Sequence, residues 1–420
     1  MTRVYDVISA DGHIEAPPSL WVEHMPKAMR QMAPRIEKHP KGGDAIVIGD
    51  KPMPLGLTLT GGRPFKDFKS AGLSYDDQHP GAGGPAQRIK EQDMDGTDAE
   101  ILFSALAASA LKLVKDPKAN CAIARAYNDW VSEYCSYAPD RLFAVAMMPT
   151  SGVEDAVAEA RRVAGLRGIV GLNLHAFPNG GQQGSKADDA FWAVCEETNL
   201  CAVGHHNFGG ESEGRTAHPT AGSDTQPLEI EGSPDADLPY FAYQLASHLP
   251  VPTLPIMTIL QIILSGAFRR FPNLRFHFAE TGIGWLPYWL EQIDDRYHRH
   301  RFWSDVKLPK LPSEYLREHF TFTFQEDHVG VRLRDLIGVD NICWASDFPH
   351  SVGDWPYSRE VRERLFRGVP DEERRKIEAL NVACQFGIIS QEEKARQAKL
   401  PRTEPALLNV PRRWASRMPG

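Results

Sequence analysis

Asp11 and His13 stand two residues apart in the segment Ala10-Asp-Gly-His-Ile-Glu15, directly after a short apolar run. On an extended chain, residues two apart point the same way, so this carboxylate and imidazole can reach one metal ion. Glu15 continues the alternation and is a candidate extra ligand. A simple Asp-Gly turn, with no metal, is the alternative interpretation of the segment.

Further imidazoles and carboxylates directly follow other apolar runs: His175, His205, His206, Glu280 and Asp347. Taken singly, each has an ordinary structural explanation, such as a helix cap for Asp347 or an ion pair for Glu280. Together, a mixture of imidazoles and carboxylates suits zinc, manganese or iron. The predicted metal ligands are Asp11, His13, His175, His205, Glu280 and Asp347.

Eight short apolar runs precede these side chains, and several are typical of strands buried on both faces. They cover residues 4–9, 99–104, 142–147, 169–174, 201–204, 274–278, 321–324 and 341–345. Helical patterns fall between them; Asp116-Pro117 and the capping-box spacing of Ser151 and Glu154 predict two helix starts. This alternation predicts an α/β fold, a TIM (β/α)8 barrel, with functional residues at the carboxyl ends of the strands.

We expect the 420 residues to form one barrel over residues 1–390 and a C-terminal tail over 391–420. Two segments, about 28–90 and 207–250, are too long for minimal βα connections and are expected to be long loop insertions, acting as lids or substrate loops. The tail is expected to pack on a neighbour as an arm or to be disordered.

The composition is that of an ordinary globular protein, with 42% hydrophobic and 24% charged residues. A net charge of -8 argues against a nucleic-acid partner. The six cysteines form no Cys-x-x-Cys pair, there is no signal-peptide pattern at the start, and no apolar stretch is long enough to span a membrane. We therefore expect a cytoplasmic protein with no membrane partner.

Four landmarks recur in a characteristic order: Asp11-Gly-His13 followed by Pro17-Pro18, His205, Phe271-Pro-Asn-Leu274, and Trp344-Ala-Ser-Asp347-Phe-Pro. They resemble the amidohydrolase superfamily, specifically the amidohydrolase 2 branch, which includes aminocarboxymuconate-semialdehyde and γ-resorcylate decarboxylases. The resemblance spans roughly residues 4–390. It implies a TIM barrel that binds one divalent metal.

By this resemblance, Asp11, His13 and His205 are metal ligands, and Asp347 is both ligand and proton carrier. Two departures stand out: Glu280 occupies a position where the branch often has a histidine, and the fourth strand carries His175 without a metal-bridging lysine. These changes leave a carboxylate-rich set that could hold two metals.

The favoured function is a metal-dependent hydrolase or carboxy-lyase (decarboxylase) acting on a small aromatic or otherwise apolar carboxylic acid. Asp347 would carry the proton, and His206 and His248 would orient the substrate. One zinc ion is the first expectation for the cofactor, with manganese or iron as alternatives. The expected partners are a small-molecule substrate and a second copy of the chain in a homodimer.

Two alternatives stay open. One is a non-haem diiron monooxygenase on the same barrel, with Glu280, His175 and Glu15 holding a second iron. The other is a non-catalytic binding barrel that has lost its metal.

Overall fold

In the computed structural model, eight parallel strands form one sheet in the order β1-β5-β6-β7-β8-β9-β10-β11. The structure describes residues 3–17, 19–40, 42–54, 58–69, 71–75, 79–181, 183–206, 208 and 253–402. The strands are β1 (Ile8–His13), β5 (Ala99–Phe103), β6 (Leu142–Met147), β7 (Ile169–Leu174), β8 (Cys201–His205), β9 (Phe276–Ala279), β10 (Phe320–Phe324) and β11 (Ile342–Trp344). The predicted α/β barrel is confirmed.

The first strand lies further along the chain than predicted. β1 begins at Ile8 and continues through His13, so Asp11 and His13 belong to the strand itself. Gly12 lies between them in the same strand, and its backbone is not in the left-handed region. The alternative of an Asp-Gly turn is therefore wrong, and both side chains lie at the carboxyl end of a buried strand.

The first and last strands meet at a junction that we call the seam. The backbone N–H of Asp347 donates to the carbonyl of Asp11 at 2.9 Å, and the backbone N–H of His13 donates to the carbonyl of Phe348 at 2.7 Å. These bonds lie just beyond the end of β11 and join the two ends of the sheet into a nearly closed barrel.

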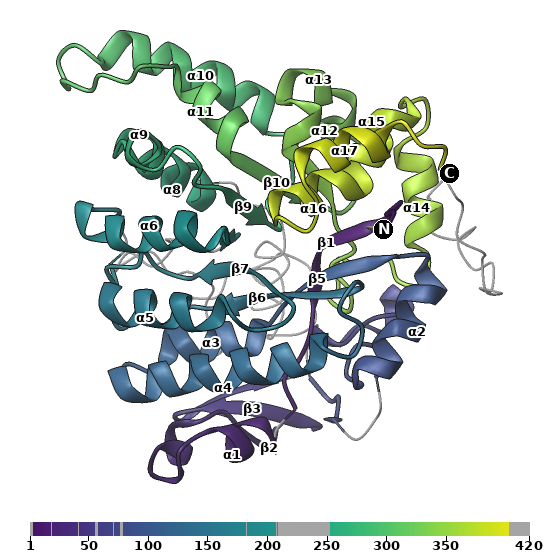
Figure 1. Cartoon of the computed structure of the whole chain (residues 1–420). Helices are drawn as coiled ribbons and strands as arrows, with labels where there is room; N and C mark the ends of the chain where they lie inside the picture. Colours follow the sequence, from purple (N-terminus) through teal and green to yellow (C-terminus); the bar gives the residue numbers. More distant parts are fainter. Residues whose placement is uncertain are drawn as a thin grey trace, which may run out of the picture.

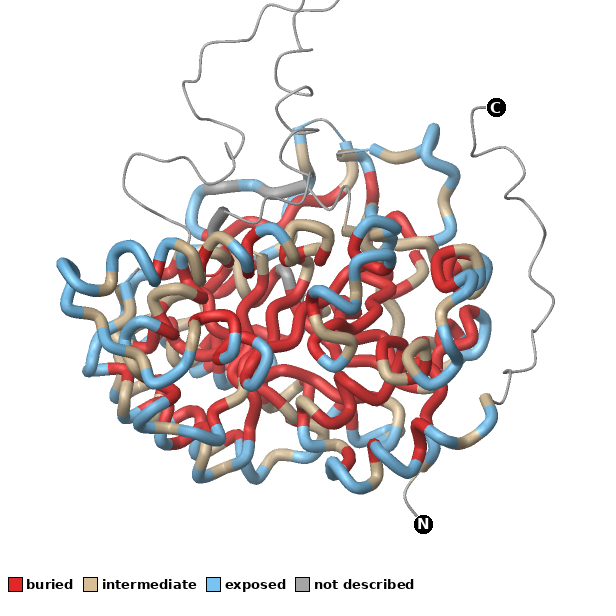
Figure 2. Tube along the Cα trace, turned by 90° about the horizontal axis from the view of Figure 1, so that it is seen from above, coloured by how far each residue is buried: buried red, intermediate tan, exposed pale blue. Residues whose placement is uncertain are grey.

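Helices cover the outside of the strands (Figure 1). The helices that follow the strands around the barrel are α2 (Pro85–Asp95), α3 (Ala105–Leu113), α4 (Pro117–Cys135), α5 (Val153–Val163), α6 (Asp189–Thr198), α8 (Thr253–Leu264), α9 (Ala267–Arg270), α10 (Leu286–His300), α11 (Pro312–His319), α12 (His328–Arg332), α13 (Arg334–Ile337) and α14 (Ser358–Leu365). Buried residues concentrate in the middle of the molecule, and exposed residues line its outer rim (Figure 2). The buried apolar residues form two clusters. The larger joins strand residues such as Leu102 and Leu172 to helix residues such as Ile123, and the smaller joins strand residues such as Ile8 to residues 379–389.

The final helical segment comprises α15 (Asp371–Arg375), the π-helix η7 (Lys376–Leu380), α16 (Asn381–Gln385) and α17 (Gln391–Ala398). It packs against β1, β10 and β11. The beginning of the expected tail is thus the helix α17, and residues 403–420 lie outside the described residues.

The two predicted helix starts have different outcomes. The Asp116 side chain accepts the backbone N–H of Ala119 at 2.8 Å, as the capping signal predicted for α4. The predicted capping box at Ser151 is wrong, because the cap residue of α5 is Gly152. The Ser151 hydroxyl instead donates to Asp155 at 2.5 Å.

The first long insertion contains structure that the sequence did not predict. A small antiparallel sheet is formed by β2 (Arg35–Lys38), β3 (Asp44–Ile48) and β4 (Lys51–Pro54), beside α1 (Leu20–His24) and the 3-10 helix η1 (Lys27–Met32) (Figure 1). After a 3-10 turn, η3 (Phe65–Asp67), the chain leads to α2. Thr60 and Gly61 both donate backbone N–H groups to the carbonyl of Pro349, so this insertion lies against the turn that follows β11.

The second insertion, 207–250, lies outside the described residues except for position 208. No helix in the described part of the chain is long and apolar enough to cross a membrane.

Candidate metal centre

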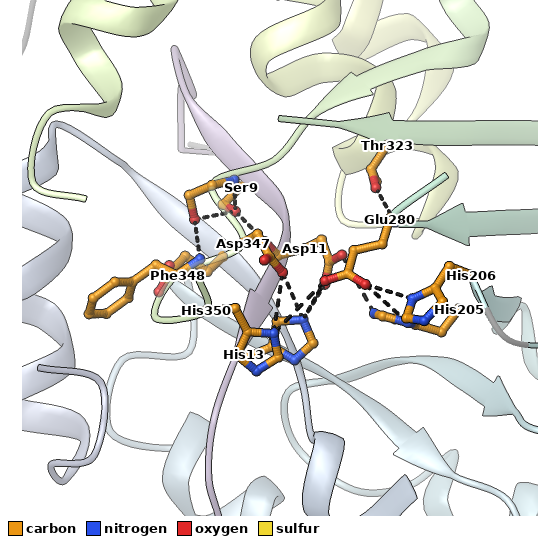
Figure 3. A network of polar contacts seen from close by, with 12 residues as sticks. Ser9, Asp11, His13, His205, His206, Glu280, Thr323, Asp347, Phe348 and His350 are labelled. Carbon is orange, nitrogen blue, oxygen red and sulfur yellow. Dashed lines mark hydrogen bonds and ion pairs between the residues drawn. The ribbon is translucent and has the colours of Figure 1, made fainter. Parts of the chain in front are cut away.

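Side chains from four strands converge at the carboxyl end of the barrel. Asp11 and His13 come from β1, His205 ends β8, Glu280 follows β9, and Asp347 follows β11 (Figure 3). The active sites of this barrel type lie at the same end.

Two overlapping groups have ligand atoms within 4.8 Å of one another. The first is Asp11, His13, His205 and Glu280, and the second is His13, Glu280, Asp347 and His350. Both groups share His13 and Glu280, so the two could hold one ion or a close pair.

The Nε2 atom of His13 lies at the centre of the cluster. It is 3.0 Å from Oδ1 of Asp347, 3.4 Å from Oδ1 of Asp11 and 3.7 Å from Oε1 of Glu280. The Nε2 atom of His205 lies 3.7 Å from Oδ2 of Asp11. These distances place nitrogen and oxygen atoms that could ligate a metal around one small volume.

Most of these buried donor atoms have no hydrogen-bond partner among the described residues. They include both carboxylate oxygens of Asp11 and of Asp347, and the Nε2 atoms of His13 and His205. Buried polar atoms are normally hydrogen-bonded, and an unpaired one indicates a missing water or ion. Imidazole nitrogens and carboxylate oxygens are donors for divalent transition metals, so these residues fit a divalent metal ion.

Two of the carboxylates lie on unusual backbone. Glu280 has φ 55° and Asp347 has φ 52°, in the left-handed region that non-glycine residues rarely adopt. Each is held there by a hydrogen bond: the N–H of Glu280 donates to Thr323 Oγ1 at 2.8 Å, and that of Asp347 donates to the Asp11 carbonyl. Backbone strain of this kind clusters at functional sites, because it aims a side chain where regular structure would not.

The carboxyl groups of the cluster titrate in opposite directions. Burial and the charge of Glu280 raise the pKa of Asp11 and of Asp347 well above the usual range. Burial also acts against ionisation of Glu280, but His205 and His206 hold its pKa well below the usual value. The first two carboxyl groups therefore retain protons that a bound cation would displace.

Burial favours the neutral form of both histidines in the first group. Burial lowers the pKa of His205 to about 3. Burial and the neighbouring His350 hold the pKa of His13 well below its ordinary value. Neutral imidazole is the form that ligates metals, so both side chains are ready to bind an ion at pH 7.

His175 is not brought into either group. Its ring follows β7, is buried, and places Nε2 3.4 Å from the thioether sulfur of Met147. Burial and the charges of Lys112 and His205 hold its pKa well below the ordinary value. The structure therefore separates His175 from the other five predicted ligands.

The remaining predicted site residues have different positions. The Nδ1 atom of His206 lies 2.6 Å from Oε2 of Glu280, at the edge of the cluster. Glu15 is buried outside both groups, with Oε1 3.8 Å from Nε2 of His350. His248 lies outside the described residues.

His350 is a site residue that sequence reasoning did not select. It belongs to the second ligand group, and its Nδ1 lies 3.6 Å from Oδ1 of Asp347. The available signal was its position three residues after Asp347 in the segment Asp-Phe-Pro-His. A turn after the strand, rather than the strand end itself, brings it into place.

A cavity of about 430 Å³ lies elsewhere, at the amino ends of β10 and β11. Its lining includes Arg317, Asp340 and Lys394, and Lys394 pairs with Asp340 at 2.9 Å. Because it is at the opposite end of the strands from the ligand cluster, it is not part of the candidate active site.

Comparison with known proteins gives consistent results. The profile of the family described as "Amidohydrolase" matches residues 11–383. The chain is 28% identical over 295 residues to γ-resorcylate decarboxylase of Rhizobium radiobacter, covering 66% of this chain and 81% of that protein. It is 21% identical over 271 residues to 2-amino-3-carboxymuconate-6-semialdehyde decarboxylase of Dictyostelium discoideum, covering 64% and 68%.

Solved structures share the fold at lower identity. An amidohydrolase from Mycobacterium avium subsp. paratuberculosis superposes with a TM-score of 0.65 at 20% identity, covering 91% of this chain and 99% of that one. A 5-carboxyvanillate decarboxylase from Novosphingobium aromaticivorans, complexed with manganese and 4-hydroxy-3-methoxy-5-nitrobenzoic acid, gives 0.56 at 16% identity, covering 91% and 96%. A dihydroxybenzoic acid decarboxylase from Polaromonas, with manganese and 2-nitroresorcinol, gives 0.57 at 17% identity, covering 92% and 98%.

Proposed function

Because the chain belongs to the amidohydrolase family, we propose that it is a metal-dependent decarboxylase of small aromatic carboxylic acids. The observation that carries the proposal is the set of buried, unpartnered donor atoms on Asp11, His13, His205 and Asp347. The curated relatives that match over most of their length are decarboxylases, which favours carboxy-lyase chemistry over hydrolysis. Family membership also favours an enzyme over a non-catalytic barrel.

Asp11, His13, His205 and Asp347 would hold the ion, with Glu280 as a further donor. A divalent cation there would act as a Lewis acid on the oxygens of the aromatic acid. Manganese is the first metal to test, because two fold neighbours contain it. Zinc, the first expectation from the sequence, uses the same donor types.

Asp347 would serve as the proton carrier. The bond between the ring carbon and the carboxylate breaks, and CO2 leaves. The electron pair of that bond stays on the ring carbon, which takes the proton that Asp347 would carry at a carboxyl oxygen. A transfer of this kind needs an acidic side chain placed at the reacting centre, and Asp347 lies at the end of the barrel where the cluster converges. His206, at the edge of the cluster against Glu280, would orient the acid, and His248 is proposed for the same task.

A diiron monooxygenase is the second candidate function, because the second ligand group supports it. His13 and Glu280 belong to both groups, while Asp347 and His350 complete the second. Such a shared arrangement could hold two adjacent ions. His350 would then take the place that the sequence assigned to His175 in the second iron site.

Elemental analysis of protein purified without chelators separates the two candidates. One divalent ion per chain, together with CO2 release from a panel of hydroxybenzoic acids, supports the decarboxylase. Two irons per chain with substrate-dependent O2 uptake support the oxygenase instead. Protein that binds neither manganese nor zinc, and releases no CO2 after metal addition, contradicts the proposed function. Light scattering on the same sample tests the expected homodimer.

A further inference from the structure

Arg88 is a fully buried cation next to the candidate metal centre. It belongs to α2, and its side chain is 1% exposed. Its Nε donates to Oε2 of Glu100 at 2.6 Å, and its Nη2 donates to Oε1 of the same carboxylate at 3.1 Å. Glu100 lies on β5, the strand paired with β1. This two-point ion pair fixes the guanidinium rigidly.

The same guanidinium also holds the turn after β11. Nη2 donates to the carbonyl of Phe348 at 3.2 Å, and the guanidinium carbon lies 4.5 Å from the centre of the Phe348 ring. The Phe348 carbonyl also accepts the backbone N–H of His13 at 2.7 Å. One oxygen atom therefore joins Arg88, a metal-ligand candidate on β1, and the residue that follows Asp347.

Gly12, which lies between the ligand candidates Asp11 and His13, leaves space for the Arg88 guanidinium. A Cβ atom on Gly12 would lie 3.1 Å from Nη2 of Arg88 and 3.1 Å from Oε1 of Glu100. The glycine between Asp11 and His13 thus serves close packing against the Arg88–Glu100 pair. The Asp-Gly-His motif and the buried arginine form one structural unit.

We propose that Arg88 is a positioning residue for the metal centre. By fixing the Phe348 carbonyl, it fixes how Asp347 and His13 stand relative to one another, where Oδ1 and Nε2 are 3.0 Å apart. The inference rests on the proposed function of these two residues as ligands. Supporting groups of this kind contribute about 10- to 100-fold in metal affinity.

The chain offers a matched control in Arg362. It is also buried, pairs with the buried Glu378 at 2.9 Å, and stacks its guanidinium 4.9 Å from the ring of Trp344. Its contacts among the described residues are with Glu378, the carbonyl of Gly96 and the Trp344 ring, and none of these is a ligand candidate or part of the turn at Phe348. Glu378 also pairs with Arg374 and Arg402, so loss of the Arg362 pair reports the general effect of losing buried ion pairs at least as extensive as that of Arg88.

The test compares Arg88→Met/Glu100→Gln with Arg362→Met/Glu378→Gln in the full chain. The affinity for Mn2+ is measured by electron paramagnetic resonance of the free ion, and the melting temperature of the chelated protein is measured alongside. We expect the Mn2+ dissociation constant to rise about 10- to 100-fold for the Arg88 pair and less than 3-fold for the Arg362 pair. Equal changes in the two pairs, or no change in either, would overturn the inference.

Arg88→Lys covers the case in which the double variant does not fold. Lysine keeps the charge but cannot bind Glu100 at two points and reach Phe348 together, so the Mn2+ affinity should fall at least 3-fold. An unchanged affinity contradicts the positioning role. Failure of the proposed function is a separate result, in which the wild-type chain binds Mn2+ normally but releases no CO2.

Discussion

The imidazole of His350 stacks on that of His13, with ring centroids 3.6 Å apart and 22° between the ring planes. The Nδ1 atom of His350 lies 3.8 Å from Oε1 of Glu280, and its Nε2 lies 3.8 Å from Oε1 of Glu15. Burial would lower the pKa of His350, but contacts with these two carboxylates raise it to about 9. Without a bound ion, these contacts favour a protonated His350, whose ring lies against that of a ligand candidate and near two acids.

We expect His350→Phe to destabilise the chelated protein. The aromatic ring preserves the stack on His13, while Glu15 and Glu280 lose their buried counter-charge. Removing one partner of a buried ion pair costs about 3 kcal/mol. Urea unfolding with a chelator at pH 7.5 measures this free energy. The control His328→Phe changes an exposed histidine and should stay within about 0.5 kcal/mol. A similarly small effect at His350 would contradict the electrostatic role.

His205 and His175 should differ in metal-dependent stability. A ligand present at about 100 times its dissociation constant stabilises the folded state by about 2.7 kcal/mol. We expect His205→Ala to lose most of the stabilisation by Mn2+, because its Nε2 is one of the unpaired donors. His175→Ala should retain it, since its ring faces Met147. Unfolding curves with and without Mn2+ measure the difference, and loss in both variants would restore His175 as a ligand.

We expect Asp347→Asn to abolish catalysis, because the amide has nearly the same shape as the carboxyl group but cannot carry the proton. Loss of a general acid lowers turnover by about 10²- to 10⁴-fold. The measurement is CO2 release at saturating substrate, repeated at increasing Mn2+ so that weaker metal binding cannot account for the loss. If turnover returns to the wild-type rate at high Mn2+, Asp347 acts only as a ligand.

Asp95 gives a prediction on pH. It is buried in α2, accepts the backbone N–H of Ser358 at 3.0 Å, and burial raises its pKa to about 6. Between the unfolded value near 4 and about 6, the folded state binds more protons than the unfolded state. The contribution of Asp95 to stability therefore decreases as pH rises through this window and stays low above it.

We accordingly expect Asp95→Asn to be more stable than wild type at pH 7.5, by up to about 3 kcal/mol, with no advantage at pH 4. Unfolding in urea at several pH values provides the measurement. Glu360→Gln, an exposed change on α14, is the control and should show no such trend. A constant difference between Asp95→Asn and wild type across the pH range would contradict the prediction.

The sequence predicted the barrel well because buried parallel strands are nearly continuous apolar runs. β6 and β7 have the predicted bounds. The sequence did not predict the small sheet of β2, β3 and β4. Its strands β2 and β4 include Lys, Arg and Pro residues, which do not give the apolar pattern of a strand.

The candidate site was predicted less completely. Strand ends indicated which side chains reach the rim, and five of the six predicted ligands converge there. The apolar pattern does not report the direction of a side chain after the last strand residue, so His175 could not be told apart from His205. Turn geometry after β11 depends on contacts with Arg88 and the first insertion, and these bring His350 into the cluster.

The seam has a consequence for the order in which the protein is made. Asp11 and His13 leave the ribosome before the strands β5 to β11, whereas Asp347, Phe348 and His350 follow only after all of these strands. Until then β1 has β5 as its ladder partner and its other edge is open. Closure of the barrel and completion of the ion-binding cluster therefore both wait for the segment after β11, and a chain released before residue 347 would lack both.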